Sequence, residues 1–425
     1  MEKKLLEQLE QLSVPKQALH EARMKALQQK RREQRRHRRT VKMTLLLAAM
    51  LALFITSIRI SPTDANAVAK IPGFQQLVDM IAYDKGVEDI LQNNYFESVG
   101  ASATKGDLTY SIDQVIADES GMIIAYKVEG LIEPDEIERT TIEVFQRGKP
   151  VEASYGYSLF ATEETTMIED KIEVAASEMM DYTYRDFEVR FIKDDEITSI
   201  PFTLQQDIVK TKDYQVNEEI QIDGQKLTVK SVHISPLRVE IKFLFHTENT
   251  KRILSIGSLQ LLDENGEEWG KISNGITGFG SEIEGAMSYF LQSNYFREPK
   301  ALTLVVSELE ALTKGEDFIE VDFEKGQLLY MPKLPLLEVT AVQKAAVEFT
   351  YIPKNPNSHI QVFGEGVDAT GKKVEGRGGF SSGFEEWIEA SAKYETDDIT
   401  NPVKIYIYSY PVFLNGSAEV EIPLK

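Results

Sequence analysis

A charge-free run near the N-terminus constrains this chain more than any other feature. Residues 43–58 read MTLLLAAMLALFITSI, and Lys42 and Arg59 flank them. A helix rises 1.5 Å per residue, so about 20 residues cross a ~30 Å hydrocarbon core, and flanking basic side chains lengthen the span by snorkelling. The sequence therefore predicts one transmembrane helix over 43–60. A buried core helix is the alternative, but such a helix does not usually carry so one-sided a basic flank.

Basic side chains crowd the N-terminal side of this run. Residues 1–42 carry 13 Lys and Arg against 5 Asp and Glu, a net charge of +8, so the rest of the chain carries −29 of the total of −21. By the positive-inside rule, residues 1–42 are predicted to be a basic cytoplasmic tail, with the bulk of the chain outside the cell membrane. The residues predicted to set this topology or contact anionic lipid are Arg31, Arg32, Arg35, Arg36, Arg38, Arg39 and Lys42. Contact with nucleic acid is the other role of such a run, and we do not predict it here.

A cleaved signal peptide is the second alternative for this region. Ala65, Asn66 and Ala67 have the A-x-A form of a cleavage site, and a basic region followed by an apolar core is the right order. The region before the apolar core is, however, far longer than in an ordinary signal peptide. A retained anchor is therefore favoured, and cleavage after Ala67 stays open.

The tail has a helical pattern of its own. Four leucines recur at helical spacing and form one apolar stripe: Leu5, Leu6, Leu9 and Leu12. So short a segment has no core in which to bury this stripe. We therefore expect the stripe to dock on a partner, on itself or on the membrane surface.

Beyond Tyr95 the hydrophobic period changes to two, and β-branched and aromatic residues dominate. Three similar units open with paired strands at 108–128, 227–245 and 337–352, and close with a second pair at 187–204, 302–323 and 403–424. Turn residues separate the runs, as at Asp223-Gly224, at 263–266 and at Thr370-Gly371-Lys372. Units of about 100 residues with short strands are typical of immunoglobulin-like β-sandwiches.

The predicted fold class is therefore mainly β, with tandem immunoglobulin-like modules on a single transmembrane helix and a short helical tail. The predicted parts are the tail, the span, a spacer with a short helix and three modules, at 1–42, 43–60, 61–93, 94–206, 213–327 and 334–425. Joints between the modules are predicted at 205–214 and 326–335.

No motif for catalysis appears in the sequence. The chain has no cysteine and five scattered histidines, without H-E-x-x-H spacing, a Walker loop, a G-x-S-x-G elbow or a calcium loop. The many carboxylates are most simply solvated charges. We predict that the protein is not an enzyme, and we predict no catalytic residue, cofactor or metal site.

The residues after the charge-free run resemble a known family. The run SPTDANAVAKIPGFQQLVDMI at 61–81, followed by Asn93-Asn94-Tyr95 and LTYSIDQVIADESGMIIAYKVEG at 108–130, resembles firmicute membrane proteins with the domain DUF4179. Residues 217–331, with ISPLRVEIKF and LQLLDENGEEW, resemble the companion domain DUF5643.

The resemblance implies a negative effector of an extracytoplasmic-function sigma factor, similar to an anti-sigma factor. The tail would then hold the sigma factor through Leu5, Leu6, Leu9 and Leu12, and the outer modules would sense an envelope signal or ligand that the sequence does not identify. Many anti-sigma domains carry a His/Cys zinc site, which a chain without cysteine lacks. The other interpretation is a surface-displayed binding or structural protein of the cell envelope, with no sigma-factor partner.

Overall fold

The structure is a computed structural model that describes residues 84–272, 277–281, 285–352, 361–383 and 387–424. These residues fall in one compact unit, Pro72–Lys425. The predicted tail and span, at 1–42 and 43–60, lie outside the described residues. Among the helices that the structure describes, none combines the length and the apolar character needed to cross a bilayer.

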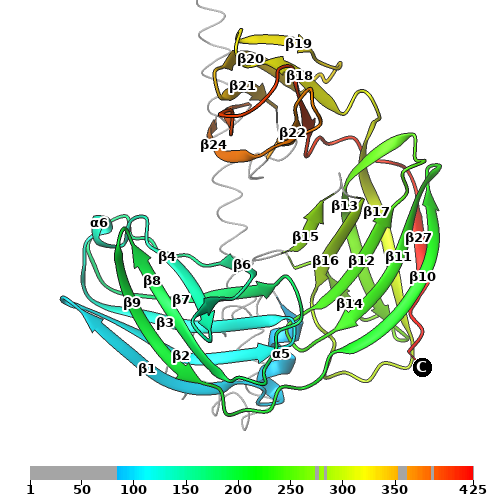
Figure 1. The fold of residues 1–425 in the computed structure, drawn as a ribbon. Helices are drawn as coiled ribbons and strands as arrows, with labels where there is room; N and C mark the ends of the chain where they lie inside the picture. Colours follow the sequence, from blue (N-terminus) through cyan, green and yellow to red (C-terminus); the bar gives the residue numbers. More distant parts are fainter. Residues whose placement is uncertain (1–83, 273–276, 282–284, 353–360, 384–386, 425) are drawn as a thin grey trace, which may run out of the picture. The chain divides into compact units, whose positions relative to one another are not determined.

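The described chain is mainly β, as the sequence predicts, and its sheets are antiparallel (Figure 1). The first module contains two sheets that share one core. One sheet has the order β1 (Glu97–Lys105), β2 (Leu108–Asp118), β3 (Gly121–Ile132), β7 (Thr165–Ala176), β6 (Ala153–Gly156). The other has the order β5 (Lys149–Pro150), β4 (Thr141–Gln146), β8 (Asp186–Lys193), β9 (Glu196–Thr203), with the short helix α6 (Pro134–Ile137) before β4.

Alternation along the strands explains how these two sheets pack. Ile112 and Ile124 of one sheet and Val144 and Val189 of the other are fully buried in the same hydrophobic cluster. Each such side chain stabilises the fold by about 1.5–3 kcal/mol relative to an exposed position.

The second module repeats the arrangement with a different chain path. One sheet has the order β10 (Lys212–Ile222), β11 (Gln225–Ile234), β12 (Val239–Phe245), β16 (Ala286–Leu291), β15 (Gly278–Ser281). The other has the order β14 (Glu268–Gly270), β13 (Lys251–Asp263), β17 (Leu302–Thr313), β27 (Ser417–Glu421). Trp269 is the largest fully buried side chain of their shared core.

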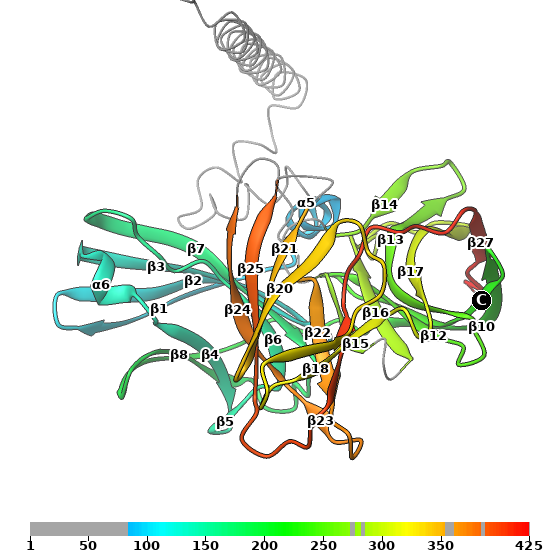
Figure 2. The same ribbon diagram turned by 90° about the horizontal axis from the view of Figure 1, so that it is seen from above.

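The third module lies between β17 and β27 in the sequence. One sheet has the order β19 (Gln327–Tyr330), β18 (Phe318–Asp322), β26 (Val403–Ile407), β22 (Phe363–Val367), β23 (Lys373–Val374). The other has the order β20 (Leu337–Gln343), β21 (Ala346–Tyr351), β25 (Ile388–Tyr394), β24 (Gly376–Gly383), and Figure 2 shows its strands side by side.

This path corrects part of the predicted organisation. Strands β17 and β18, predicted as one closing pair at 302–323, belong to different sheets, and so do β26 and β27, predicted as a pair at 403–424. Instead, β17 pairs with β27 from Thr303–Glu421 to Ser307–Ser417. The third module is therefore inserted into the second. The two modules therefore do not follow the predicted boundaries 213–327 and 334–425 or the predicted joint at 326–335. The prediction read each polar stretch between two strands as a turn within one sheet, whereas here it is a crossing to another sheet.

The predicted strand pairs that are adjacent in the sequence are mostly confirmed. The opening pairs at 108–128, 227–245 and 337–352 and the closing pair at 187–204 form hairpins or adjacent antiparallel strands. Asp223 and Gly224 form the predicted tight turn between β10 and β11, with φ of 46° and 76°. The observed turn confirms the prediction made from this dipeptide. Glycine adopts such positive φ values without steric cost.

Candidate functional site

The end of the predicted spacer, 61–93, enters the described structure as a helix. Helix α5 (Lys85–Gln92) begins at Asp84, whose Oδ1 accepts hydrogen bonds from the N–H groups of Gly86 at 2.7 Å and Val87 at 3.4 Å. This N-cap satisfies two of the four free donors at the start of a helix. Val87, Ile90 and Leu91 are buried, so one face of the helix is anchored in the unit.

Helix α5 precedes the first module in sequence but is bound to the second. Arg297 forms an ion pair with Asp89 at 2.7 Å, and the Asp89 side chain is 4% exposed. The backbone N–H of Lys85 donates to Gln292 Oε1 at 3.2 Å, and Lys85 Nζ donates to the carbonyl of Glu268 at 2.9 Å. The helix therefore ties the chain before the first module to the second module.

A buried acid lies where the first and second modules meet. Asp118, at the end of β2, is fully buried. Its Oδ1 accepts from the N–H and hydroxyl of Ser120 at 2.7 and 2.6 Å, and its Oδ2 accepts from the N–H of Leu237 in the β11–β12 turn at 2.7 Å. Burial raises the pKa of Asp118, against the opposing effects of these donors and of Arg238. The carboxyl group thus joins the two modules directly.

Arg238 is the cation that faces this acid from the second module. Its guanidinium is buried, lies 4.8 Å from the ring centre of Phe290, and donates through Nη2 to the carbonyl of Val174 in the first module at 3.4 Å. Its Nε has no hydrogen-bond partner among the described residues. Burial lowers the pKa of Arg238, and the charge of Asp118 opposes this. Asp118 and Arg238 make no described hydrogen bond or ion pair with each other, and each is held by a backbone group of the other module.

Two tyrosines complete this region, which we call the first junction: helix α5, Asp118, Arg238 and their partners. The Tyr95 hydroxyl donates to the carbonyl of Ala117 at 2.8 Å and accepts from the N–H of Val209, in the connection between the modules, at 3.2 Å. The Tyr182 hydroxyl donates to the Asp118 carbonyl at 2.8 Å. Burial raises the pKa of both tyrosines, so both hydroxyls remain protonated donors at neutral pH.

The contacts of the first junction hold the first and second modules to each other. The described residues contain no group of three or more His, Cys, Asp or Glu that could hold a metal ion. The predicted docking and topology residues, from Leu5 to Lys42, lie outside the described part of the chain. The sequence interpretation missed Asp118 and Arg238, although both lie in the runs IADESG and ISPLRVE that carry the family resemblance.

Comparison with known protein families finds matches that include both of these runs. Residues 35–130 match the model of a domain of unknown function, DUF4179, and residues 211–341 match that of a family of unknown function, DUF5643. Asp118 lies in the first match and Arg238 in the second, so the first junction is a contact between the two matched segments.

One solved structure is similar in part. It is the crystal structure of a conserved domain protein from Bacillus anthracis. The alignment covers 55% of this chain and 84% of the Bacillus anthracis chain, at 13% sequence identity and a TM-score of 0.38. None of the curated proteins matches the sequence. The chain therefore combines a segment that matches DUF4179 with a segment that matches DUF5643.

Proposed function

We propose that this protein is a membrane-anchored signalling regulator, a negative effector of an extracytoplasmic-function sigma factor. The tail at 1–42 binds the sigma factor in the cytoplasm, residues 43–60 span the membrane, and the β modules form the extracytoplasmic sensing region. The observation that carries the proposal is helix α5, which lies at the end of the predicted spacer and is hydrogen-bonded to the second module.

A physical route for the signal follows from this position. A regulator needs an element with two arrangements whose equilibrium the signal shifts. In this proposal the element is the first junction. A change in how the first module meets the second would alter the contacts of Asp118 with Leu237 and of Asp89 with Arg297. Helix α5, and the chain that leads from it to the predicted span, would then move.

We also propose that the three modules are immunoglobulin-like. Two antiparallel sheets around one core, in units of about 100 residues, support this classification. The insertion of the third module into the second means that each module must be compared by its strand order and not by a continuous sequence range.

The tail provides the test of this function. Full-length variants Leu5→Glu and Leu9→Glu are expected to lose repression of a sigma-dependent reporter, because a carboxylate cannot be buried against an apolar partner without a large desolvation cost. Gln11→Glu, on the face away from the leucine stripe, is the matched control and should repress normally. Protein levels in the membrane fraction are measured in parallel.

Full repression by both leucine variants would overturn tail docking. A tail with a scrambled order but the same basic charge separates the proposal from its rival. If that tail also supports normal function, a surface-displayed binding or structural protein of the envelope becomes the better interpretation.

A further inference from the structure

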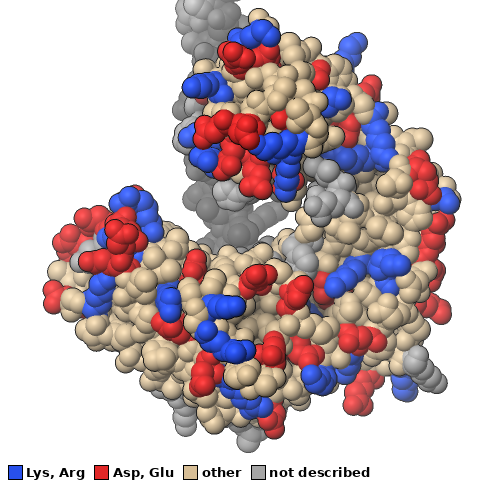
Figure 3. All heavy atoms as spheres, viewed as in Figure 1, with Lys and Arg blue, Asp and Glu red and all other residues tan. Residues whose placement is uncertain are grey.

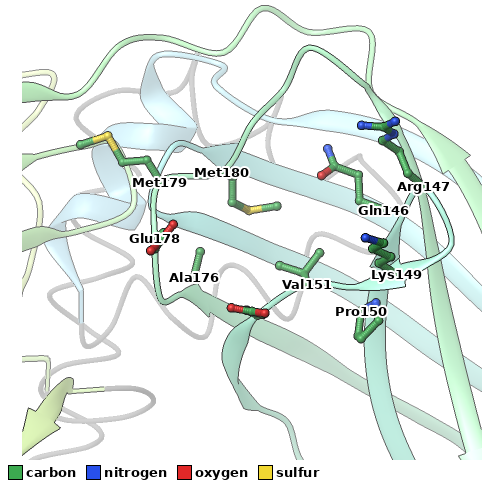
Figure 4. A pocket seen from close by; sticks show the side chains of 10 residues that line it. Gln146, Arg147, Lys149, Pro150, Val151, Ala176, Glu178, Met179 and Met180 are labelled. Carbon is green, nitrogen blue, oxygen red and sulfur yellow. The ribbon is translucent and has the colours of Figure 1, made fainter.

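A pocket of about 400 Å³ opens in the first module, beside the turn between β4 and β5 and the segment after β7. Its size falls in the range of sites for small ligands. Figure 4 shows Arg147 and Lys149 on one side, Glu178 on the other, and Val151 and Met180 between them. The lining is therefore charged with opposite signs at its two sides and apolar in the middle.

The pocket gathers four charged side chains. Arg147, Lys149, Glu152 and Glu178 line it, and none of them forms an ion pair with a described residue. On the face shown in Figure 3, acidic and basic side chains often lie next to each other. The four charged groups of the pocket can therefore contact a ligand without first breaking an ion pair.

The basic side is held in place by its own turn. Arg147 and Gly148 both have positive φ, of 55° and 73°, and join β4 to β5. The guanidinium of Arg147 lies 4.1 Å from the ring centre of Tyr184. Beside it, Gln146 Nε2 donates to the carbonyls of Asp181 and Tyr184 at 2.8 and 2.7 Å. The arginine is therefore oriented before any ligand arrives, which lowers the entropy cost of binding.

The middle of the pocket suits an uncharged stem. Val151 and Met180 are partly buried, Ala176 is buried, and Met179 is 56% exposed. Exposed, flexible thioethers adapt to ligands of different shape. An ammonium group would meet Glu152 and Glu178, and a carboxylate would meet Arg147 and Lys149.

We propose that this pocket binds short peptides with free termini, through their ammonium and carboxylate ends. The proposal rests on the proposed sensing function and names the chemical class that the first module would detect. The segment that forms the acidic side leads directly to the first junction. The N–H of Ala176 donates to the carbonyl of Ser120 at 3.0 Å, and that of Met180 donates to the carbonyl of Glu119 at 2.9 Å. A ligand that moves this segment would thus act on the neighbours of Asp118.

The test uses the full-length chain, labelled with ¹³C at its methionine methyl groups, and tri-alanine as the probe. Leucine substitutions at Met179 and Met180 assign their signals. We expect these two signals to shift on titration, while Met122, buried in the same module, and Met167, exposed elsewhere on it, stay unchanged. Acetylating the amine or amidating the carboxylate should weaken binding about fivefold for each end, the effect of losing an exposed ion pair of about 1 kcal/mol.

Variants at the two sides complete the test. Glu178→Gln and Lys149→Gln should each weaken tri-alanine binding about fivefold, whereas Glu163→Gln, an exposed acid outside the pocket, should not. Absence of a shift at Met179 and Met180, or equal binding of the capped and uncapped peptides, would overturn the proposal. The binding assay involves no sigma factor, so its failure is distinct from a failure of the repression assay.

Discussion

The first junction joins the first and second modules, and a second junction joins the second and third modules. The two junctions hold their modules together by different contacts. Between the first and second modules the chain passes at residues 93–96, from α5 to β1, and again at 204–211, and hydrogen bonds of Asp118 and Arg238 lie between them together with the ring contact of Tyr95 with Phe296. Between the second and third modules it crosses twice, through residues 314–317 and 408–416. There, Leu254 and Leu312 of the second module's strands are buried in the core of the third.

The second junction contains a buried ion pair with further hydrogen-bond partners. Arg252 Nε lies 2.7 Å from Asp317 Oδ2, and its Nη2 donates to the carbonyls of Asp317 and Ile407. Glu310 accepts from the hydroxyls of Ser255 and Ser409 at 2.8 and 3.1 Å. A shared hydrophobic core makes the second junction less dependent on any one polar contact. At the first junction most of the described contacts are hydrogen bonds and ion pairs, which suits the proposed response to a signal.

The largest effect is expected from Asp118→Ala. It leaves the N–H groups of Leu237 and Ser120 without their acceptor, so the free energy of unfolding should fall by about 2–5 kcal/mol in urea titrations of the full chain. Asp118→Asn, which keeps one acceptor oxygen, should lose less. A loss below about 1 kcal/mol for Asp118→Ala would show that the first junction does not depend on this carboxyl group.

The corresponding change at the second junction is Asp317→Ala, with an expected loss of about 2 kcal/mol. Arg252 retains the carbonyl acceptors of Asp317 and Ile407, so the cost is close to that of one hydrogen bond to a charged group. Limited proteolysis should reveal new cleavage between the first and second modules in Asp118→Ala, and none between the second and third in Asp317→Ala. The opposite pattern would reverse the comparison.

The variant Gly86→Ala tests whether the close contact between helix α5 and the second module contributes to stability. An added Cβ would lie 2.8 Å from the backbone nitrogen of Ser293 and 3.0 Å from its carbonyl oxygen. Forcing this contact open costs about 1–3 kcal/mol, and the higher helix propensity of alanine offsets up to ~1 kcal/mol. We expect a net loss of about 1 kcal/mol, with the exposed Gln92→Ala as a near-neutral control in the same helix. An unchanged stability would mean that this contact is not required.

The smallest expected effect belongs to a turn of the third module, which provides a reference outside both junctions. Hydrogen bonds from the hydroxyl of Thr370 and the N–H groups of Thr400 and Lys372 hold the pKa of Asp368 well below its usual range. A depressed folded-state pKa stabilises the protein above pH ~4 and loses this effect as the pH falls through the folded-state pKa. Asp368→Asn should therefore lower the Tm at pH 7, and the difference from the unchanged chain should shrink steadily below pH 4. A pH-independent difference would argue against this assignment.

Local features of the fold could be predicted from the sequence, and long-range ones could not. Alternation and turn residues such as Asp223 and Gly224 identify paired strands because both act within a few residues. The pairing of β17 with β27 joins residues more than 100 positions apart, and nothing in the local pattern of 302–323 distinguishes a crossing from a hairpin. Asp118 has the sequence context of an ordinary solvated turn acid, because burial by another module leaves no local signature.

The insertion of the third module also constrains the order in which the chain can fold. Strand β17 is made before the third module, but its partner β27 is made after it. During synthesis, the edge of β17 that pairs with β27 therefore stays unpaired until the third module has emerged, and an unpaired edge is a template for aggregation. The third module has all its strands available earlier. It can fold first, and by pairing Phe318 with Tyr406 it would bring its two connections to the second module side by side and guide the late strand to its place.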